Sequence, residues 1–580
     1  MRNSKISTDY KMNDEESRKA LLFIYINIGV IETSANHTFT HQQIKSYQSL
    51  LALSEKSHKT LEISRGGGDT IEQMDIVTLE YFIFIFFTAL IYWSLKGKNK
   101  WIVLLFSSLI FFFANSKPST VLYMLYSTTS VYFGTILLEK RDERKKQIIA
   151  GAVIISNLAI LAVLKYSNLF IDAVNFVGIL FDNSEPILHR VSLIAPLAIS
   201  FYTLQIIGYF IDCYRGEIKP EQNIFKLLLF TCYFPMMVSG PICRFSDVQN
   251  SLFNNNSFDY QRVSLGIKRI ALGLIKKIAI GNRLFSVVSI IDADISTYSG
   301  YYIWISALLY SLYLYMDFSG CMDIISGVSN ILGVKLPDNF KAPFFSRSTR
   351  EFWRRWHITL GAWLRDYVLD SLLKSRIYIN ITKISIKKLD KKRGRNLSVY
   401  ISMLSVWICM GIWHGNGWKY VLGEGLWYWM VIVLGMMLES KFNNLRNSLK
   451  IDANSNCWHI FQSIRTLIIF SVGNLFFKAT NLNSAFNQII KSFSVRGDIG
   501  VFSNLISDNS NIRGLTNVSV LLVAILLVLI VDILIYKDKD VFKIIAKKGF
   551  LARWTVYTLM IALIVLSLGT HSVPFAYAMF

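Results

Sequence analysis

Charged residues are scarce in this sequence. They make up 17% of its 580 residues, whereas hydrophobic residues make up 53%. Soluble globular domains are about one quarter charged, so this composition argues against a soluble protein and indicates a polytopic membrane protein. Many of the apolar stretches also approach the length of about 20 residues that crosses a bilayer core.

Acidic residues are scarcer than basic ones. The chain holds 39 Asp and Glu against 61 Lys and Arg, and its net charge is +22. Residues 1–75 are nearly neutral, so the basic excess lies in the remainder, in short loops between apolar spans. That placement is typical of the cytoplasmic loops of membrane proteins. Nucleic-acid binding is the competing interpretation of a basic chain, and we expect no nucleic-acid partner.

Several motifs are missing. The six Cys show neither CxxC nor zinc-like spacing, so we predict no disulfide framework and no zinc or iron–sulfur site. No cleavable signal peptide is evident, because the apolar run at 21–31 lacks a clear small-residue cleavage site. No internal repeat is visible, which weakens an inverted-repeat transporter interpretation.

Residues 1–76 differ from the rest, being mixed, polar and ended by the flexible-looking linker SRGGGDT. Within them, HTFTH places His37 and His41 at i, i+4, a spacing that can hold a metal. The Glu of HExxH is absent, so we favour two exposed polar residues and predict no metal site. We therefore expect an N-terminal polar extension of unknown role at 1–76 and a membrane domain at 77–580.

The membrane domain is expected to be all-α, with about 11 to 13 transmembrane or re-entrant helices. The basic segments 138–147 and 374–395 are both expected to face the cytoplasm. The predicted spans lie near 77–95, 101–115, 119–138, 148–170, 191–211, 225–240, 265–290, 301–333, 398–413, 418–438, 460–478, 517–536 and 552–570.

The segment EFWRRWHITLGAWLRDY, residues 351–367, fits neither a spanning helix nor a soluble one, because it combines three Trp with several charges. As a single helix it would present Trp353, Trp356 and Trp363 on one broad face and leave Arg354 elsewhere. Such a helix is typical of an interfacial or re-entrant element. On spacing alone, we favour a helix that anchors the protein, with His357 as a bystander.

His414 lies in MGIWHGNGW, residues 410–418, at the end of an apolar span and beside Trp413. Ionisable residues at membrane depth are candidates for function, and a neutral imidazole can take a proton from a hydroxyl near neutral pH. The alternative is a histidine hydrogen-bonded in the core, and the residues alone leave both open. Gly411 and Gly415 permit close backbone approach or a break in the helix.

Asp317 and Asp323 interrupt the apolar segment 313–334. They are expected to orient His or Arg side chains, or to pair with Arg354 or Arg355. Alternatively, they cap a broken helix, because Ser and Gly follow soon after Asp317.

Five blocks together resemble the membrane-bound O-acyltransferase (MBOAT) family, and in particular the bacterial branch that contains the alginate O-acetyltransferase membrane subunit. The resemblance covers roughly residues 77–580, and several blocks in order are more specific than any one motif. The blocks are SFYTLQ (200–205), FPMMVSGPI (234–242), MDFSGCMDI (316–324), NFKAPFFSRSTREFWRRWHITLGAWLRDYV (339–368) and GIWHG (411–415).

The resemblance implies a ring of tilted helices around a thin centre, with a funnel from each face. The family's near-invariant histidine falls on His414, and its second position, His or Asn in a re-entrant helix, falls on His357. Both are therefore expected to be catalytic. Four further residues are expected to support them or to contact substrate: Asp317, Arg354, Trp353 and Trp413.

The implied activity is O-acyl transfer, most readily O-acetylation. The acyl group would come from a cytoplasmic thioester, acetyl-CoA or an acyl carrier protein, with no bound cofactor. Its acceptor would be a hydroxyl of an extracytoplasmic polysaccharide or cell-wall polymer. The branch usually works with an extracytoplasmic partner of SGNH-hydrolase type, which we expect on a separate chain. The expected location is the bacterial cytoplasmic (inner) membrane, with multiple passes.

Three alternatives stay open. Within the same family, the chain would transfer D-alanine toward teichoic acid. From another class, it would be a transporter or flippase for a lipid-linked sugar, since intramembrane Asp and His suit proton relays. A third alternative is a non-catalytic scaffold that recruits the extracytoplasmic partner.

Overall fold

The computed structural model describes residues 74–575, with gaps at 140, 182–185, 194, 296–297, 299, 416, 495–511 and 569–572. The chain divides into two units, residues 1–70 and 71–580, and every described residue belongs to the second. His37 and His41 lie outside the described residues. The extension predicted at 1–76 and its role therefore stay predictions.

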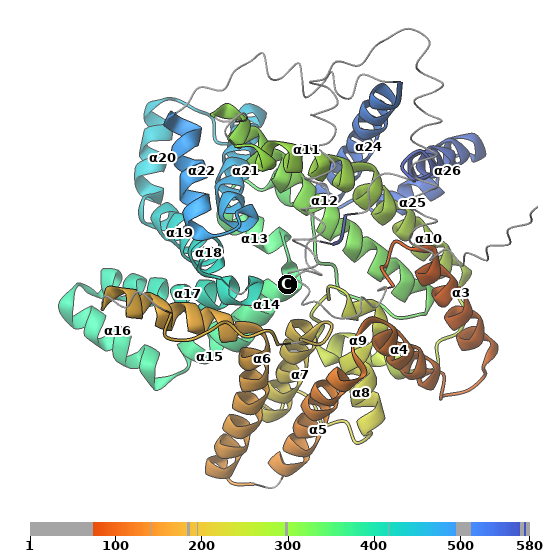
Figure 1. The fold of residues 1–580 in the computed structure, drawn as a ribbon, viewed down its shortest axis with the longest axis horizontal. Coiled ribbons are helices and arrows are strands. Elements are labelled where there is room, and N and C mark those ends of the chain that lie inside the picture. Colours follow the sequence, from red (N-terminus) through yellow and green to blue (C-terminus); the bar gives the residue numbers. More distant parts are fainter. Residues whose placement is uncertain are drawn as a thin grey trace, which may run out of the picture. The chain divides into compact units, whose positions relative to one another are not determined.

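The described residues form helices and loops without a β-strand (Figure 1), which confirms the all-α prediction. The helices before the middle of the chain are α3 (Leu79–Ser94), α4 (Trp101–Asn115), α5 (Val121–Leu138), α6 (Glu143–Leu180), α7 (Ile199–Tyr214), α8 (Ile224–Cys232), α9 (Phe245–Phe253), α10 (Tyr260–Leu274), α11 (Asn282–Ala293) and α12 (Tyr301–Ile331).

Shorter helices follow, and then a second group of long ones. These are α13 (Thr349–Arg355), α14 (Ile358–Trp363), α15 (Asp370–Leu373), α16 (Arg376–Lys388), α17 (Lys391–His414), α18 (Trp418–Tyr420), α19 (Trp427–Met437), α20 (Glu439–Ser448), α21 (Asn456–Lys478), α22 (Leu482–Ser494), α24 (Ile512–Tyr536), α25 (Val541–Ala546) and α26 (Phe550–Val565).

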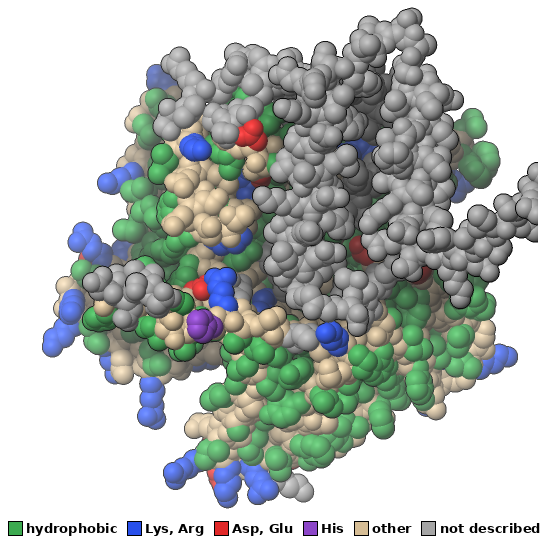
Figure 2. Space-filling view, viewed as in Figure 1, with side chains coloured by type: hydrophobic (Ala, Val, Ile, Leu, Met, Phe, Trp, Pro, Cys, Tyr) green, Lys and Arg blue, Asp and Glu red, His purple; other side chains and the backbone are tan. Residues whose placement is uncertain are grey.

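Six helices in the described part of the chain are long and apolar enough to cross a membrane, and α3, α4 and α26 are shorter apolar helices. The chain is therefore a multi-pass membrane protein, as predicted, while the number of 11 to 13 helices stays a prediction. Large apolar side chains remain exposed, among them Phe86, Phe106 and Phe133. Figure 2 shows a nearly continuous apolar surface over α4 and α5, which is suited to contact with lipid.

Short polar side chains begin several helices by accepting hydrogen bonds from the first backbone N–H groups. Asn223 starts α8, Asp259 starts α10 and Asp390 starts α17 in this way. Such caps stabilise a helix by about 1 kcal/mol. The backbone N–H groups of Arg393 and Lys392 also hold the pKa of the exposed Asp390 carboxyl below its usual value.

Some predicted spans have different bounds in the structure. The span expected at 225–240 ends at Cys232, because Pro235 follows within a short 3₁₀ turn and Pro has no N–H to continue the helix. The span expected at 265–290 is helical throughout, but residues 275–281 form a π-helix between α10 and α11. Helix α12 runs unbroken, so the suggestion that Asp317 or Asp323 caps a broken helix is wrong.

Helices α10 and α12 approach each other closely at two glycine pairs, Gly266 with Gly327 and Gly273 with Gly320. A Cβ added at Gly273 would lie 2.6 Å from the carbonyl oxygen of Gly320. Small residues allow backbones in a membrane to approach this closely, and the packing then replaces the hydrophobic effect that lipid cannot supply.

The same two helices are joined by buried charges. Asp323 of α12 accepts from Lys276 at 2.7 Å and from Arg269 at 3.0 Å. Six residues earlier in α12, the fully buried Asp317 pairs with Lys277. Charges inside a membrane protein are costly unless they are paired within the protein, so these pairs fix the register of α10 and the π-helix against α12.

We predict that Gly273→Ala destabilises the protein. The added methyl group would clash with α12, and overpacking of this kind costs about 1–3 kcal/mol. The matched change Gly435→Ala, in α19, meets no atom within 4 Å and should be neutral or stabilising, because Ala suits a helix better than Gly by about 0.5–1 kcal/mol. Thermal unfolding of the two purified variants in one detergent measures this, and equal midpoints would contradict it.

Candidate active site

The segment 351–367 is not one helix, so that prediction is wrong. Helix α13 ends at Arg355, and α14 begins at Ile358. Between them Trp356 is extended and His357 adopts the left-handed conformation, with φ 47°. Trp356 forms an isolated antiparallel bridge with Phe340. The break separates the Trp residues that were expected to share one face.

The backbone just before the segment makes the break possible. Lys341 N donates to Arg355 O at 3.0 Å, and Ile358 N donates to Asn339 O at 3.0 Å. The Asn339 side-chain oxygen accepts from Thr359 N at 3.0 Å and from the Thr359 hydroxyl at 2.9 Å. These bonds pair groups that the interrupted helix leaves without intrahelical partners, and an unpaired buried group costs about 1–3 kcal/mol.

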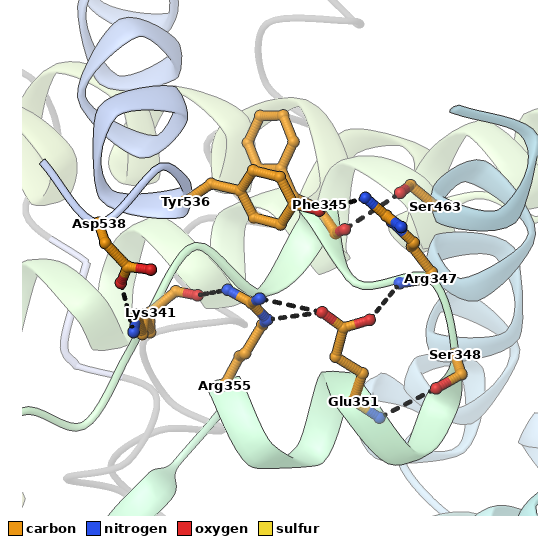
Figure 3. A network of polar contacts seen from close by, with 9 residues as sticks. All are labelled: Lys341, Phe345, Arg347, Ser348, Glu351, Arg355, Ser463, Tyr536 and Asp538. Atoms are coloured by element: carbon orange, nitrogen blue, oxygen red, sulfur yellow. Dashed lines mark hydrogen bonds and ion pairs between the residues drawn. The ribbon is translucent and has the colours of Figure 1, made fainter. Parts of the chain in front are cut away.

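The start of α13 is held by a polar network (Figure 3). Ser348 accepts from Glu351 N at 3.2 Å, and Glu351 accepts from Arg347 N at 2.9 Å, an arrangement related to a capping box. Glu351 also pairs with Arg355 at 3.0 Å. Arg355 in turn lies over the ring of Tyr536, at the end of α24. The network anchors the outer end of the broken segment.

His357 is buried, with 1% of its surface exposed. Its ring packs edge-to-face against Phe318 of α12 and Trp413 of α17, with centroid distances of 4.9 and 5.4 Å. Nδ1 lies 3.4 Å from the Asn339 side-chain oxygen. That atom must be oxygen, because it accepts from a backbone N–H. His357 Nδ1 therefore carries the proton, and Nε2 of the neutral ring carries the lone pair.

His414 is equally buried and ends α17. Its Nδ1 lies 2.9 Å from the carbonyl oxygen of Met410 and 3.6 Å from Oε2 of Glu424. A carbonyl only accepts, so Nδ1 carries the proton here too, and Nε2 is left as the basic atom. Glu424 lies in the π-helix 421–426 between α18 and α19, and a carboxylate beside Nδ1 would stabilise the imidazolium.

Trp413 lies between the two histidines. Its ring centroid is 5.4 Å from that of His357 and 5.1 Å from that of His414. Its indole Nε1–H is buried and has no hydrogen-bond acceptor among the described residues. Buried donors are normally satisfied, so this N–H can serve an oxygen that arrives with a substrate.

Lys165 of α6 is a site residue that the sequence analysis missed. Its ammonium donates to Trp413 O and to the Ser200 hydroxyl, each at 2.9 Å, and it lies 5.7 Å from the Trp413 ring centroid. A signal was available, because Lys165 is the one charged residue in the predicted span 148–170. Glu424, alone in the span 418–438 apart from Lys419, gave a similar signal.

The other expected residues take different places. Asp317 pairs with Lys277, while Arg355 pairs with Glu351, so the suggested pairing of Asp317 with Arg355 is not the arrangement found. Arg354 is exposed at the end of α13, unlike the buried histidines. Trp353 packs on Trp407 and Tyr428 rather than on either histidine ring.

Residues from the sequence blocks that resemble the MBOAT family lie together at this site. Phe201 packs on the Trp413 ring at 5.2 Å, and Phe318 packs on His357. Ile242 N donates to the Thr359 hydroxyl at 3.2 Å. Gly415 and Gly411 also lie against residues 420–421, where a Cβ would clash, which confirms the expected close approach. The site is thus assembled from α6, α7, α12, α14, α17 and the loops between them.

Fold and site together define an all-α, multi-pass membrane protein with two buried histidines at its centre. Residues 219–477 match the model of the membrane-bound O-acyltransferase family, a range that includes both histidines but not Lys165. This part of the chain therefore resembles the MBOAT family, as the sequence blocks predicted.

Several curated bacterial proteins are similar to the chain. "Probable alginate O-acetylase AlgI" of Pseudomonas putida is 33% identical over 58% of this chain and 63% of its own length. "Peptidoglycan O-acetyltransferase" of Helicobacter pylori is 30% identical over 46% and 52%. "Teichoic acid D-alanyltransferase" of Bacillus subtilis is 31% identical over 40% and 56%. The chain thus spans about three fifths of the length of the alginate relatives it matches.

We predict that Asn339→Ala destabilises the broken segment. The change removes the acceptor of the Thr359 amide and hydroxyl and of His357 Nδ1, which should lower the free energy of unfolding by about 1–3 kcal/mol. The exposed Asn443 in α20 provides the control, since Asn443→Ala should change it by less than about 0.5 kcal/mol. Urea titration or thermal unfolding measures the stability of both variants. If Asn339→Ala had the same free energy of unfolding as the wild type, Asn339 would not support the broken segment as proposed.

Proposed function

We propose that the protein is a membrane O-acyltransferase that moves an acyl group, most readily acetyl, from a cytoplasmic thioester to a hydroxyl of an extracytoplasmic polysaccharide or cell-wall polymer. The observation that carries this proposal is the arrangement of two buried histidines around Trp413, each with Nδ1 donating and Nε2 left basic. The match to the family model and the names of the relatives support the same reaction class.

His414 is the general base. Its Nε2 takes the proton of the acceptor hydroxyl while that oxygen forms a bond to the thioester carbonyl carbon. The resulting tetrahedral oxyanion collapses, the carbon–sulfur bond breaks, and the departing thiolate takes the proton from the imidazolium. In its ionised form Glu424, with Oε2 3.6 Å from Nδ1, stabilises the imidazolium that exists between these two transfers.

The oxyanion needs a donor, and the Trp413 indole N–H is suited to this role because it is buried without an acceptor among the described residues. Lys165 holds the Trp413 backbone from the other side and adds positive charge near the developing oxyanion. Loss of one such donor typically costs about 10²–10³ in rate. His357, held by Asn339, positions the reacting groups across Trp413.

The proposed placement of donor and acceptor on opposite sides of the membrane rests on the lengths of two helices. Trp413 lies 22 residues after the start of α17, and Lys165 lies 22 residues after the start of α6. At 1.5 Å per residue, each is about 33 Å along its helix from a basic segment. Because Lys165 contacts Trp413, the contact supports a placement of both basic segments on the same side of the membrane. His414 then lies toward the opposite side, from which an extracytoplasmic acceptor would arrive.

The donor, acceptor and partner follow from the same proposal. A thioester of coenzyme A or of an acyl carrier protein supplies the acyl group, and no bound cofactor is needed. An extracytoplasmic SGNH-type acyltransferase on another chain passes the acyl group onward to the polymer. The protein itself lies in the bacterial inner membrane. D-Alanyl transfer to teichoic acid is the second candidate, because a teichoic acid D-alanyltransferase is among the relatives. The alginate relatives match more of the chain, which favours acetyl transfer.

We predict that His414→Ala lowers acyl transfer about 10²–10⁴-fold, the usual contribution of a general base. His357→Ala should also lower it, and the exposed His189→Ala should leave it unchanged. The assay uses purified protein with its partner, thioester and polymer in detergent, where no sealed vesicle exists and a transporter would show no turnover. If His414→Ala transferred acyl groups at the wild-type rate at equal protein levels, His414 would be excluded as the general base and the scaffold alternative would be favoured.

We predict that the acyl group is acetyl. Mass spectrometry of surface and wall polymers from a deletion strain should show loss of acetyl ester, restored by the wild-type gene and not by His414→Ala. Loss of D-alanyl ester with acetyl ester intact would instead assign the chain to teichoic acid modification.

A further inference from the structure

Helices α16 and α17 form a hairpin within the second basic segment of the chain. Helix α16 ends at Lys388 and α17 begins at Lys391, so only two residues connect them. A Cβ added at Gly394 of α17 would lie 2.6 Å from the Cα of Ile386 in α16. The two helices therefore pack closely, and α16 lies alongside the first part of the spanning helix α17.

Positive charge is concentrated on this hairpin. Residues 374–395 contain nine Lys and Arg but one acidic residue, Asp390, and all nine basic residues are exposed. Asp390 pairs with Arg393 at 3.3 Å. Within the described part of the chain, no ion pair joins the other eight to a carboxylate. In Figure 2, Lys and Arg side chains gather along the edge of the molecule where Figure 1 places α16.

The exposed surface of α16 combines basic side chains with isoleucines. Lys383 and Lys387 lie one helical turn apart, on the same face. Ile377 and Ile384 lie along one edge of that face and are 63% and 56% exposed, and the exposed Ile379 lies along the opposite edge. Apolar groups therefore flank the basic face on both sides.

These isoleucines lie near the level at which α17 becomes apolar. The uncharged part of α17 begins shortly after Arg395, and Leu397 is about 9 Å along the helix from Lys391. Helix α16 has 13 residues and runs back along α17 for about 20 Å from the short connection. Lys387 thus lies near the charged start of α17, while Ile377 lies beside its apolar part.

A lipid surface fits this arrangement better than a soluble acidic protein does. Lys side chains extend their apolar stems along a hydrophobic surface and keep their ammonium groups in the polar layer. Helices that carry basic and large apolar residues together are typical of the membrane interface. An acidic protein could neutralise the lysines, but it could not cover isoleucines that lie at the depth of the bilayer.

We propose that α16 binds the headgroups of anionic phospholipids. Lys383 and Lys387 contact the lipid phosphates, and Ile377 and Ile384 lie against the acyl chains. Basic residues beside a spanning helix each strengthen binding to a negatively charged membrane surface. The site is separate from the acyl-transfer chemistry, so it can be tested whether or not the proposed function is correct.

The binding test uses the full-length protein in a neutral detergent and two probes, short-chain phosphatidylglycerol and short-chain phosphatidylcholine. A ligand that binds the folded protein raises its midpoint of thermal unfolding, so titration of each lipid gives an apparent affinity. The wild type should prefer phosphatidylglycerol. The double variant K383Q/K387Q should bind that lipid about tenfold more weakly and phosphatidylcholine as before, and the difference from the wild type should shrink at high salt.

Two further variants separate charge from apolar contact. K145Q/K146Q is the matched control, because these lysines of the other basic segment already pair with Asp142 and Glu143 at 3.3 and 3.0 Å. It removes the same amount of charge and should bind phosphatidylglycerol as the wild type does. I377S/I384S should weaken the binding of this lipid without changing its salt dependence, because acyl-chain contact is lost while the lysines remain.

Equal affinity of the wild type for the two lipids would overturn the proposal, and so would wild-type affinity of K383Q/K387Q for phosphatidylglycerol. Equal losses in K383Q/K387Q and K145Q/K146Q would show that net charge rather than α16 attracts the lipid, which also overturns it. If K383Q/K387Q kept its lipid affinity but lost binding of an acyl carrier protein, the hairpin would be a protein-docking surface instead.

Discussion

The bilayer core offers no hydrogen bonds, so every polar group that the chain carries into it must be paired within the protein. This constraint is most demanding at the break between Trp356 and His357, where the backbone leaves the helix. Asn339 meets it with a backbone carbonyl for Ile358 and a side-chain oxygen for Thr359 and His357. Because those partners are provided, a histidine can be held in the left-handed conformation within a buried site.

The same constraint shapes the surroundings of the site. The charges on α10 and the π-helix after it are paired with Asp317 and Asp323 of α12, and glycine pairs let the helices approach closely enough for that. The result is a rigid α12 whose Phe318 supports the His357 ring. Packing around His357 therefore depends in part on ion pairs between neighbouring helices.

Trp413 links the two halves of the site. One face of the arrangement is His357, supported by Asn339, and the other is His414, supported by Met410 and Glu424. Lys165 holds the Trp413 backbone from a third direction. Each histidine therefore has its own support, and both share one aromatic ring.

Much of the fold followed from the sequence. Low charge and long apolar runs indicated an all-α, multi-pass membrane protein, and α12, α17 and α21 lie close to predicted spans. The bounds near Pro235 were less accurate, because a run of apolar residues does not reveal where the backbone ceases to be helical. The single helix predicted for 351–367 failed for a related reason: its regular spacing was real, but the partners that permit a break lie outside the segment.

The sequence by itself determined the membrane character of the chain, its resemblance to the MBOAT family and the positions of the two candidate histidines, since these reside in composition and in contiguous blocks. Only the tertiary structure decided how the histidines are paired and oriented. Asn339 precedes His357 by 18 residues and Lys165 precedes Trp413 by 248, and no local pattern connects residues so far apart. Hydrogen bonds and ion pairs depend on distances of a few ångströms in space, which only the packing of the helices creates.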